Sequence, residues 1–395
     1  MFHQNPKDRF VKKLLRSIVV LSSAALLLPL AGCSMFNWFS KPAPRHPPAA
    51  LAQFTPSKTP HRVWSANVGS SGNYVFSPAY TYDAIYSAAA DGTVVKVDAS
   101  TGNEIWRKNV DMDLTAGVAS DGTTVVVAGV KGVLIALDSD GQEKWKAPVS
   151  TEVLAAPVIA HGLVVVRSMD NKIAAYDVDT GERKWMVAHR APSLMLRSSP
   201  GIATVGPTAI VSLPGGRMLS MMLNNGAIRW EIPIGDARGA TELERIADMS
   251  GVPAIYGQGV CVTAYQGRIG CFDVVSGSTF WVKNFSSKVG VSIDEEHVYA
   301  VDADDKVYAF SNFRGQSVWR NDKMTYRDLT TPVPFGSTVA TGDGQGFVHF
   351  LSRYDGSFDA RIETDGSAIS ATPIVVGDRL IVQTRAGSLQ AFTLD

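Results

Sequence analysis

The stretch Val94-Val95-Lys96-Val97-Asp98, with Gly102 and Trp106 behind it, is the clearest copy of a repeat that runs along the chain. Its first half is a short alternating strand, and it recurs eight times, at residues 94–98, 134–138, 173–177, 219–223, 269–273, 307–311, 348–352 and 389–393. Its second half, Gly-x-x-x-Trp, follows at Gly102/Trp106, Gly141/Trp145, Gly181/Trp185, Gly226/Trp230, Gly277/Trp281 and Gly315/Trp319, and in degenerate form at Gly356/Ala360. A period of about 40 residues with several short strands is typical of propeller blades.

The two ends of the chain do not match, and this mismatch predicts how the ring closes. The eighth strand copy has no tryptophan after it because the chain stops at Asp395, whereas an unclaimed strand around Trp64 lies at the other end. Closing the ring with that strand removes unpaired strand edges. We therefore predict an all-β fold, an eight-bladed β-propeller over residues 61–395, in which the N-terminal strand completes the last blade.

The recurring tryptophans have two interpretations, an aromatic binding surface or a packing contact repeated between blades. Packing is favoured, since one bulky side chain in the same slot of every blade buries a large apolar area at every interface. The glycine before each tryptophan permits a turn with positive φ. We assign this structural role to Trp64, Trp106, Trp145, Trp185, Trp230, Trp281 and Trp319.

The N-terminal residues 1–32 have the features of a signal peptide: a basic segment and then an apolar run over 17–28. The run ends in Leu30-Ala31-Gly32-Cys33, which resembles the lipobox of bacterial lipoproteins. That resemblance implies an acylated Cys33, and Ser34 after it implies sorting to the outer membrane; an ordinary signal peptide with an unrelated cysteine is the alternative. Residues 33–60, which begin with Cys33 and are rich in proline, are predicted to form a tether.

Charge and motifs exclude several classes of function. Lys+Arg and Asp+Glu both number 37, and without residues 1–32 the balance is mildly acidic, so nucleic acid is not an expected partner. We find no metal-binding histidine motif, nucleophile elbow or phosphate loop, and we expect no catalytic residue, metal or cofactor. Cys261 and Cys271 lie on neighbouring strands of one hairpin, where a disulfide and two buried thiols are both compatible with the sequence.

The spacing of the tryptophans is even except in two places, after Trp185 and after Trp230. Both connections join an outer strand to the next inner strand, so they emerge on the same face, and insertions on one face of a repeat ring usually mark the binding face. The first carries Leu194, Leu196 and Arg197, and the second carries Glu242, Glu244 and Asp248. An exposed Leu/Arg cluster suits an interface; leucines tucked under the ring are the alternative.

Two known families share such a repeat. The Asp-x-x-x-Gly-x-x-x-Trp phrase resembles quinoprotein alcohol dehydrogenases, which are longer enzymes with a quinone stacked on a disulfide between adjacent cysteines. Cys261 and Cys271 are ten residues apart and cannot form that disulfide. The second resemblance, to the BamB family of outer-membrane protein assembly factors, covers almost the entire chain. It is carried by residues 33–37, by the Trp-Ser-x-x-Val-Gly opening at 64–69 and by the long connections around 192–197 and 241–248.

The resemblance to the BamB family implies a non-catalytic scaffold of the β-barrel assembly complex, lipid-anchored on the periplasmic side of the outer membrane. In that family the two long connections bind the POTRA domains of BamA, and the matching positions here are Leu194, Leu196, Arg197 and Asp248. Because Ser250 stands where a second acid is common in the family, the resemblance implies either a weaker acidic contact or one that is shared with Glu242 or Glu244. Unfolded outer-membrane proteins are a further expected partner. A quinoprotein-like dehydrogenase and a scaffold for another periplasmic partner are the alternatives.

Overall fold

The computed structural model describes residues 46–235, 241 and 246–395. The chain divides into Met1–Pro47 and Pro48–Asp395. The predicted signal peptide and Cys33 therefore lie outside the described residues, as do Glu242 and Glu244. Within the described part, no helix is long and apolar enough to cross a membrane.

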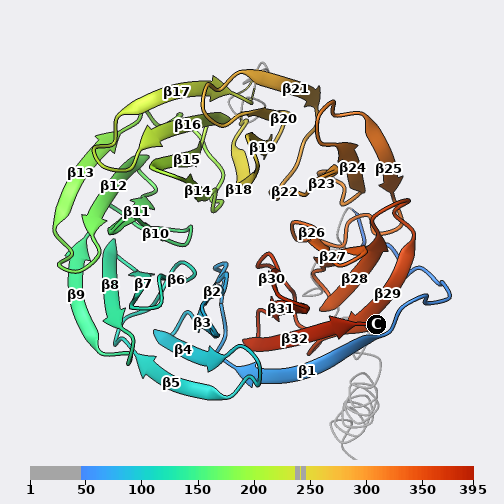
Figure 1. The fold of residues 1–395 in the computed structure, drawn as a ribbon, viewed down its shortest axis with the longest axis horizontal. Coiled ribbons are helices and arrows are strands. Elements are labelled where there is room, and N and C mark those ends of the chain that lie inside the picture. Colours follow the sequence, from blue (N-terminus) through green and yellow to red (C-terminus); the bar gives the residue numbers. More distant parts are fainter. Residues whose placement is uncertain (1–45, 236–240, 242–245) are drawn as a thin grey trace, which may run out of the picture. The chain divides into compact units, whose positions relative to one another are not determined.

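The described residues from 60 to 395 form eight four-stranded antiparallel sheets arranged as blades around an axis (Figure 1), which confirms the predicted propeller. From the innermost strand outward, blades 1 to 4 consist of β2(Ala79–Thr81), β3(Ala84–Ala88), β4(Thr93–Asp98), β5(Glu104–Asn109); β6(Ala119–Ser120), β7(Thr124–Gly129), β8(Val133–Asp138), β9(Glu143–Pro148); β10(Val158–Ala160), β11(Leu163–Arg167), β12(Lys172–Asp177), β13(Arg183–Ala188); and β14(Ile202–Val205), β15(Thr208–Leu213), β16(Arg217–Met222), β17(Ile228–Pro233).

Blades 5 to 8 repeat the arrangement. They consist of β18(Met249–Tyr256), β19(Gly259–Ala264), β20(Arg268–Asp273), β21(Thr279–Asn284); β22(Val291–Ile293), β23(His297–Val301), β24(Val307–Ser311), β25(Ser317–Asn321); β26(Val333–Phe335), β27(Thr338–Gly342), β28(Phe347–Ser352), β29(Phe358–Glu363); and β30(Ile374–Val376), β31(Arg379–Gln383), β32(Ser388–Leu394), with β1(Pro60–Asn67) as the outer strand of the last blade.

The middle strands of each blade supply the core. β3, β7, β15, β19 and β27 are buried along their whole length, because each has a neighbouring blade on both faces. The sequences of such strands are continuous runs of apolar or small residues and do not alternate between apolar and polar residues. Outer strands such as β5 and β17 alternate between exposed and half-buried residues, since one of their faces meets solvent.

The ring closes as the mismatch of ends predicts. β1 pairs antiparallel with β32, with Trp64 opposite Ala391, so the N-terminal strand completes the blade that the C-terminus leaves with three strands. Strands from opposite ends of the chain therefore pair in the last blade, which has four strands like the others.

The tryptophans are packing residues, as expected. Each indole Nε1 donates to a backbone carbonyl of the next blade, at 2.7 to 3.1 Å, in the pairs Trp64–Ala99, Trp106–Ser139, Trp145–Val178, Trp185–Leu223, Trp230–Val275, Trp281–Asn312 and Trp319–Arg353. Burial of the rings is uneven: Trp64, Trp145, Trp281 and Trp319 are buried, and the other three are half-buried.

The repeat glycine has a second role besides positive φ. At Gly315 the backbone has φ 62°, and a Cβ placed there would lie 2.4 Å from the ring of Trp281. The same glycine-on-indole contact recurs from Gly102 against Trp64 to Gly356 against Trp319. The residue is glycine because its turn lies flat against the tryptophan of the preceding blade.

The last part of the segment predicted as a tether belongs to the same unit as the ring. Residues 48–59, predicted as part of the tether, lie on blade 7, where Phe54 stacks on Phe358 with ring centroids 5.1 Å apart. The boundary between tether and ring therefore falls at residue 48 and not at residue 61. Pairing between segments about 300 residues apart gives no periodic pattern, so the sequence alone does not reveal it.

The question left open for the two cysteines is also answered. Cys261 on β19 and Cys271 on β20 are direct partners in the strand register, with Cα atoms 4.1 Å apart, and their sulfurs are bonded. Both side chains are fully buried in the core between blades 5 and 6.

Candidate partner-binding surface

The two long connections lie next to each other around blade 4. Residues 189–201 link β13 to β14, and residues 234–248 link β17 to β18, so both emerge on the face where an outer strand crosses to the next inner strand. The end of the first connection is joined to the strand that follows the second, because the Gly201 amide donates to the carbonyl of Gly251 on β18 at 2.9 Å. We call the described part of these connections the loop surface.

The loop surface exposes an apolar side chain and a cation that are three residues apart in the sequence. Leu194 is 44% exposed and the Arg197 side chain is 59% exposed, whereas Leu196 is half-buried. The interpretation that the leucines tuck under the ring therefore does not describe Leu194. Both features suit a protein interface, where arginine is enriched.

Asp248 is not on the surface. It is 1% exposed, and its carboxylate accepts the amide protons of Leu196 and Gly215, the latter at 2.7 Å. The buried carboxylate of Asp248 thus binds the backbone of the first connection at Leu196 and fixes the position of that residue. In this structure its contact is with the loop rather than with solvent.

A buried arginine accompanies Asp248. Arg167, at the end of β11, is 3% exposed; burial lowers its pKa to about 10, and the negative charge of Asp248 acts in the opposite direction. At neutral pH the guanidinium is still charged, so the carboxylate compensates a cation that would otherwise be isolated in the interior. Replacing Asp248 would leave that cation without its counter-charge.

Arg197 is held at the opening of the ring by two residues from other blades. Its Nη2 lies 2.9 Å from Oε1 of Glu152, and its guanidinium lies over the ring of Tyr74, 5.7 Å from the centroid. The Tyr74 hydroxyl donates to the same Glu152 oxygen at 3.2 Å. The hydrogen bond with Glu152 raises the pKa of Arg197, and burial together with Glu152 raises that of Tyr74. The side chain is therefore oriented before any partner arrives.

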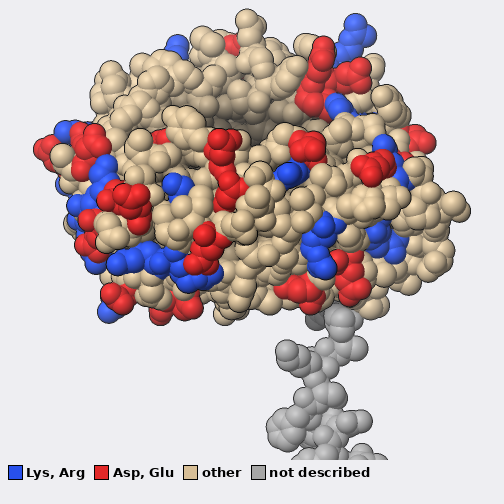
Figure 2. All heavy atoms as spheres, turned by 60° about the horizontal axis from the view of Figure 1, so that its bottom comes forward, with Lys and Arg blue, Asp and Glu red and all other residues tan. Residues whose placement is uncertain are grey.

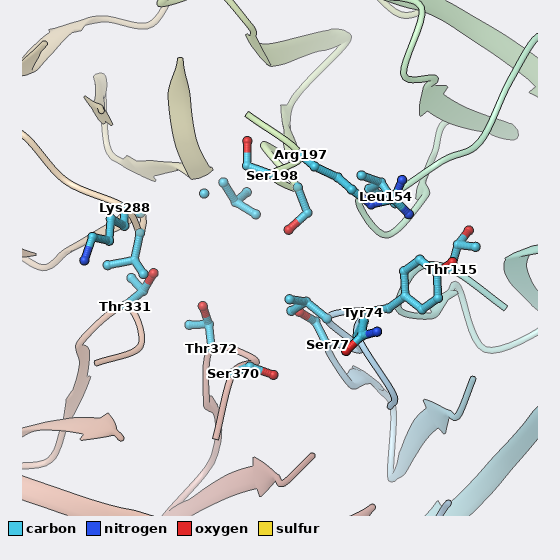
Figure 3. A pocket seen from close by; sticks show the side chains of 17 residues that line it. Tyr74, Ser77, Thr115, Leu154, Arg197, Ser198, Lys288, Thr331, Ser370 and Thr372 are labelled. Atoms are coloured by element: carbon cyan, nitrogen blue, oxygen red, sulfur yellow. The ribbon is translucent and has the colours of Figure 1, made fainter. Parts of the chain in front are cut away.

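Beside Arg197 the centre of the ring is hollow (Figure 3). The cavity measures about 280 Å³, and Arg197 and Lys288 enter it from different sides, with Ser and Thr side chains between them, among them Ser77, Thr115, Ser198, Thr331, Ser370 and Thr372. These residues belong to the connections that lead into the inner strands. They carry no motif, so the sequence analysis missed them.

Among the described residues, no group of His, Cys, Asp and Glu side chains is arranged to hold a metal ion. Basic and acidic side chains are interspersed over the face in Figure 2, without a continuous basic area. Glu242 and Glu244 belong to the part of the second connection that the structure does not describe.

Comparison with known proteins identifies the family. The profile described as "Outer membrane protein assembly factor BamB" matches residues 90–321. The protein of that name from Burkholderia pseudomallei (strain K96243) is 42% identical over 373 residues, which are 94% of this chain and 97% of the relative. This chain belongs to the BamB family. The resemblance seen in the sequence is thereby confirmed, and so is the expectation of an assembly factor rather than an enzyme.

Solved structures separate the BamB family from the alternative family. The crystal structure of BamB from Moraxella catarrhalis has a TM-score of 0.78 and 26% identity and covers 85% of this chain and 100% of its own. A quinohemoprotein alcohol dehydrogenase from Comamonas testosteroni reaches a TM-score of 0.66 at 15% identity, over 85% of this chain and 76% of its own. The likeness to the dehydrogenase is one of fold alone.

Proposed function

We propose that this outer-membrane protein assembly factor is a non-catalytic scaffold of the β-barrel assembly complex that binds the POTRA domains of BamA through the loop surface. The observation that carries the proposal is that Leu194 and the oriented Arg197 are both exposed on the first of the two connections that are longer than any others between the repeat tryptophans. Arginine is enriched among the hot-spot residues of interfaces, and the exposed leucine adds apolar area that a partner can cover.

The support beneath the loop surface favours tight binding. Asp248 holds the backbone at Leu196, and Glu152 with Tyr74 holds the side chain of Arg197. A surface that is ordered before association loses less conformational entropy when it binds. In this account Leu194 and Arg197 touch the partner, Leu196 supports them, and Asp248 acts through the loop. Glu242 and Glu244 remain proposed acidic contacts.

The test is co-purification of BamA from membranes with Leu194, Leu196 and Arg197 all changed to alanine. We expect loss of BamA from the eluate with an unchanged melting temperature. The matched control changes Phe313 and Arg314 to alanine, an exposed apolar–cation pair on a hairpin turn at the opposite face. Retention of BamA by the triple variant, or equal loss in the control, would place the interface elsewhere.

The proposed location has a separate test. We propose that Cys33 carries the lipid that anchors the protein at the periplasmic face of the outer membrane. The variant Cys33→Ser should move the protein from the outer-membrane fraction to the soluble periplasmic fraction, because its acyl chains are the membrane attachment. Outer-membrane fractionation of the variant at the level of the natural protein would contradict lipid anchoring.

A further inference from the structure

The segment before the first strand follows the outer edge of blade 7. Its amides and carbonyls are bound at intervals: the Ala49 amide donates to the Thr325 carbonyl at 2.9 Å, and the Ser57 amide donates to the Asp359 carbonyl at 3.0 Å. The Ser57 hydroxyl also donates to the Asp359 carboxylate at 2.6 Å. We call residues 48–59 the strap.

The strap runs antiparallel to β29. Ser57 lies at the beginning of β29, where Asp359 is, Ala52 lies at Arg361, and Ala49 lies beyond the end of the strand, at Thr325. Thr325 belongs to the connection between β25 and β26, which joins an outer strand to the next inner strand, as the connections of the loop surface do. The strap therefore begins on the face that carries the loop surface.

Two arginines hold the strap: Arg327 in the connection between β25 and β26, and Arg361 on β29. The side chain of Arg327 is 2% exposed; its Nε donates to Asp343 at 2.8 Å, and its Nη1 donates to the Ala49 carbonyl at 2.7 Å. Asp343 is shared with the buried His349, whose Nε2 lies 2.9 Å from the same carboxylate oxygen. A buried guanidinium needs a partner for each of its donors, and the strap carbonyl supplies one of them.

Arg361 makes the second attachment. Its Nη2 donates to the Ala52 carbonyl at 2.6 Å, and its guanidinium lies 5.0 Å from the ring centroid of Phe54, which stacks on Phe358. A planar guanidinium can stack on an aromatic ring and donate to a carbonyl at the same time. Arg361 thus combines two contacts that a lysine would not reproduce.

The strap docks on the blade whose outer strand, β29, lacks the repeat tryptophan. Ala360, opposite Phe350 on β28, occupies the slot that Trp319 occupies opposite Ala309 on β24. A tryptophan in that slot packs on the Gly turn of the next blade, and blade 8 has no such turn because its outer strand is β1. Phe54 does not fill that slot, because it stacks on Phe358, which packs against the core between blades 6 and 7, whereas Ala360 belongs to the core between blades 7 and 8.

We propose that residues 48–59 are a fixed strap that docks along the outer edge of blade 7 and makes the chain leave the ring beside Thr325, on the same face as the loop surface. Resting on the proposed lipid anchor, this assignment leaves only residues 33–47 between the acylated cysteine and the ring. Fifteen residues reach at most about 50 Å, so the strap limits how far, and from which face, the anchor can hold the ring.

Hydrogen–deuterium exchange on the purified full-length protein tests the strap without reference to BamA. We expect peptides over 46–59 to exchange at least about tenfold faster in the variant Arg361→Ala than in the natural protein. The reason is that loss of the Arg361 contacts undocks the strap and frees its amides. Arg320→Ala is the matched control, since Arg320 holds the same repeat position beside Trp319, is 54% exposed and pairs with Asp322 of its own blade connection. Equal exchange in all three proteins would overturn the proposal.

A crosslink provides a second readout that does not depend on a destabilising change. The double variant Ser57→Cys/Asp359→Cys places thiols where two side chains are in hydrogen-bond contact, within disulfide reach. We expect oxidation to close a loop that alters migration on a non-reducing denaturing gel. Both thiols free after oxidation, in a folded protein, would show that the strap is not docked, whether or not the anchor and BamA binding are as proposed.

Discussion

The seven tryptophan interfaces follow the repeat closely, whereas the loop surface lies where the chain departs from it. At each interface an indole packs on the glycine turn of the next blade and donates to its backbone, with little variation from Trp64 to Trp319. Around blade 4 the connections depart from the repeat, and there Leu194 and Arg197 reach solvent. The regular residues hold the ring together, so the departures from regularity are the better guide to a partner.

The largest effect on stability is expected at a buried tryptophan. Trp145 is 8% exposed, and Trp145→Ala should lower the free energy of unfolding by about 3–5 kcal/mol through the cavity and the lost apolar contacts. Urea-induced unfolding measures the loss. Trp106→Ala is the matched comparison; since Trp106 is half-buried, its loss should be smaller.

Binding should not follow the tryptophans. Under conditions where Trp145→Ala remains folded, we expect it to retain BamA, because it changes the ring and not the loop surface. If Trp145→Ala lost less than about 1 kcal/mol, or if the half-buried Trp106 mattered more, the packing role assigned to the tryptophans would be wrong.

Asp248 is buried in the ring and also binds the loop surface, so its replacement should lower both the stability of the ring and the affinity for BamA. Asp248→Asn keeps the shape but leaves Arg167 without its counter-charge and weakens the hydrogen bonds from Leu196 and Gly215. We expect a loss of about 2–3 kcal/mol in stability together with weaker BamA binding. Weaker binding with no change in the urea midpoint would instead indicate that Asp248 contacts the partner directly.

A pair of glycines separates backbone conformation from packing at the interfaces. Gly315 and Gly257 both have positive φ, but a Cβ would meet the Trp281 ring at Gly315 and would find open space at Gly257. Gly257→Ala should cost about 1 kcal/mol from the backbone alone, and Gly315→Ala clearly more. Equal losses in thermal unfolding would show that the indole contact contributes nothing.

Periodic features of the fold could be predicted from sequence, and contacts between distant segments could not. The eight blades, the closure by β1 and the role of the tryptophans follow from a repeat that any window of the chain displays. The burial of Asp248 depends on amides 33 and 52 residues away, and the place of Ala49 depends on Thr325 and Arg327.

The candidate site shows the same division. Long connections drew attention to Leu194 and Arg197 because spacing is visible in a sequence. The supporting Glu152 and Tyr74, and the serines and threonines of the central cavity, have no motif and come from separate blades. Only the closed ring brings them to one place, so residue type alone could not distinguish the contact residues from those that position them.

The most direct test of the account is the affinity of the purified full-length protein for the isolated POTRA domains of BamA, measured by calorimetry for Leu194→Ala and Phe313→Ala. Both positions expose an apolar side chain, at 44% and 77%, on opposite faces of the ring. We predict that Leu194→Ala weakens binding at least about tenfold, as the loss of a hot-spot residue does, and that Phe313→Ala leaves it unchanged. Unchanged affinity for Leu194→Ala, or an equal loss for Phe313→Ala, would contradict the assignment of the loop surface.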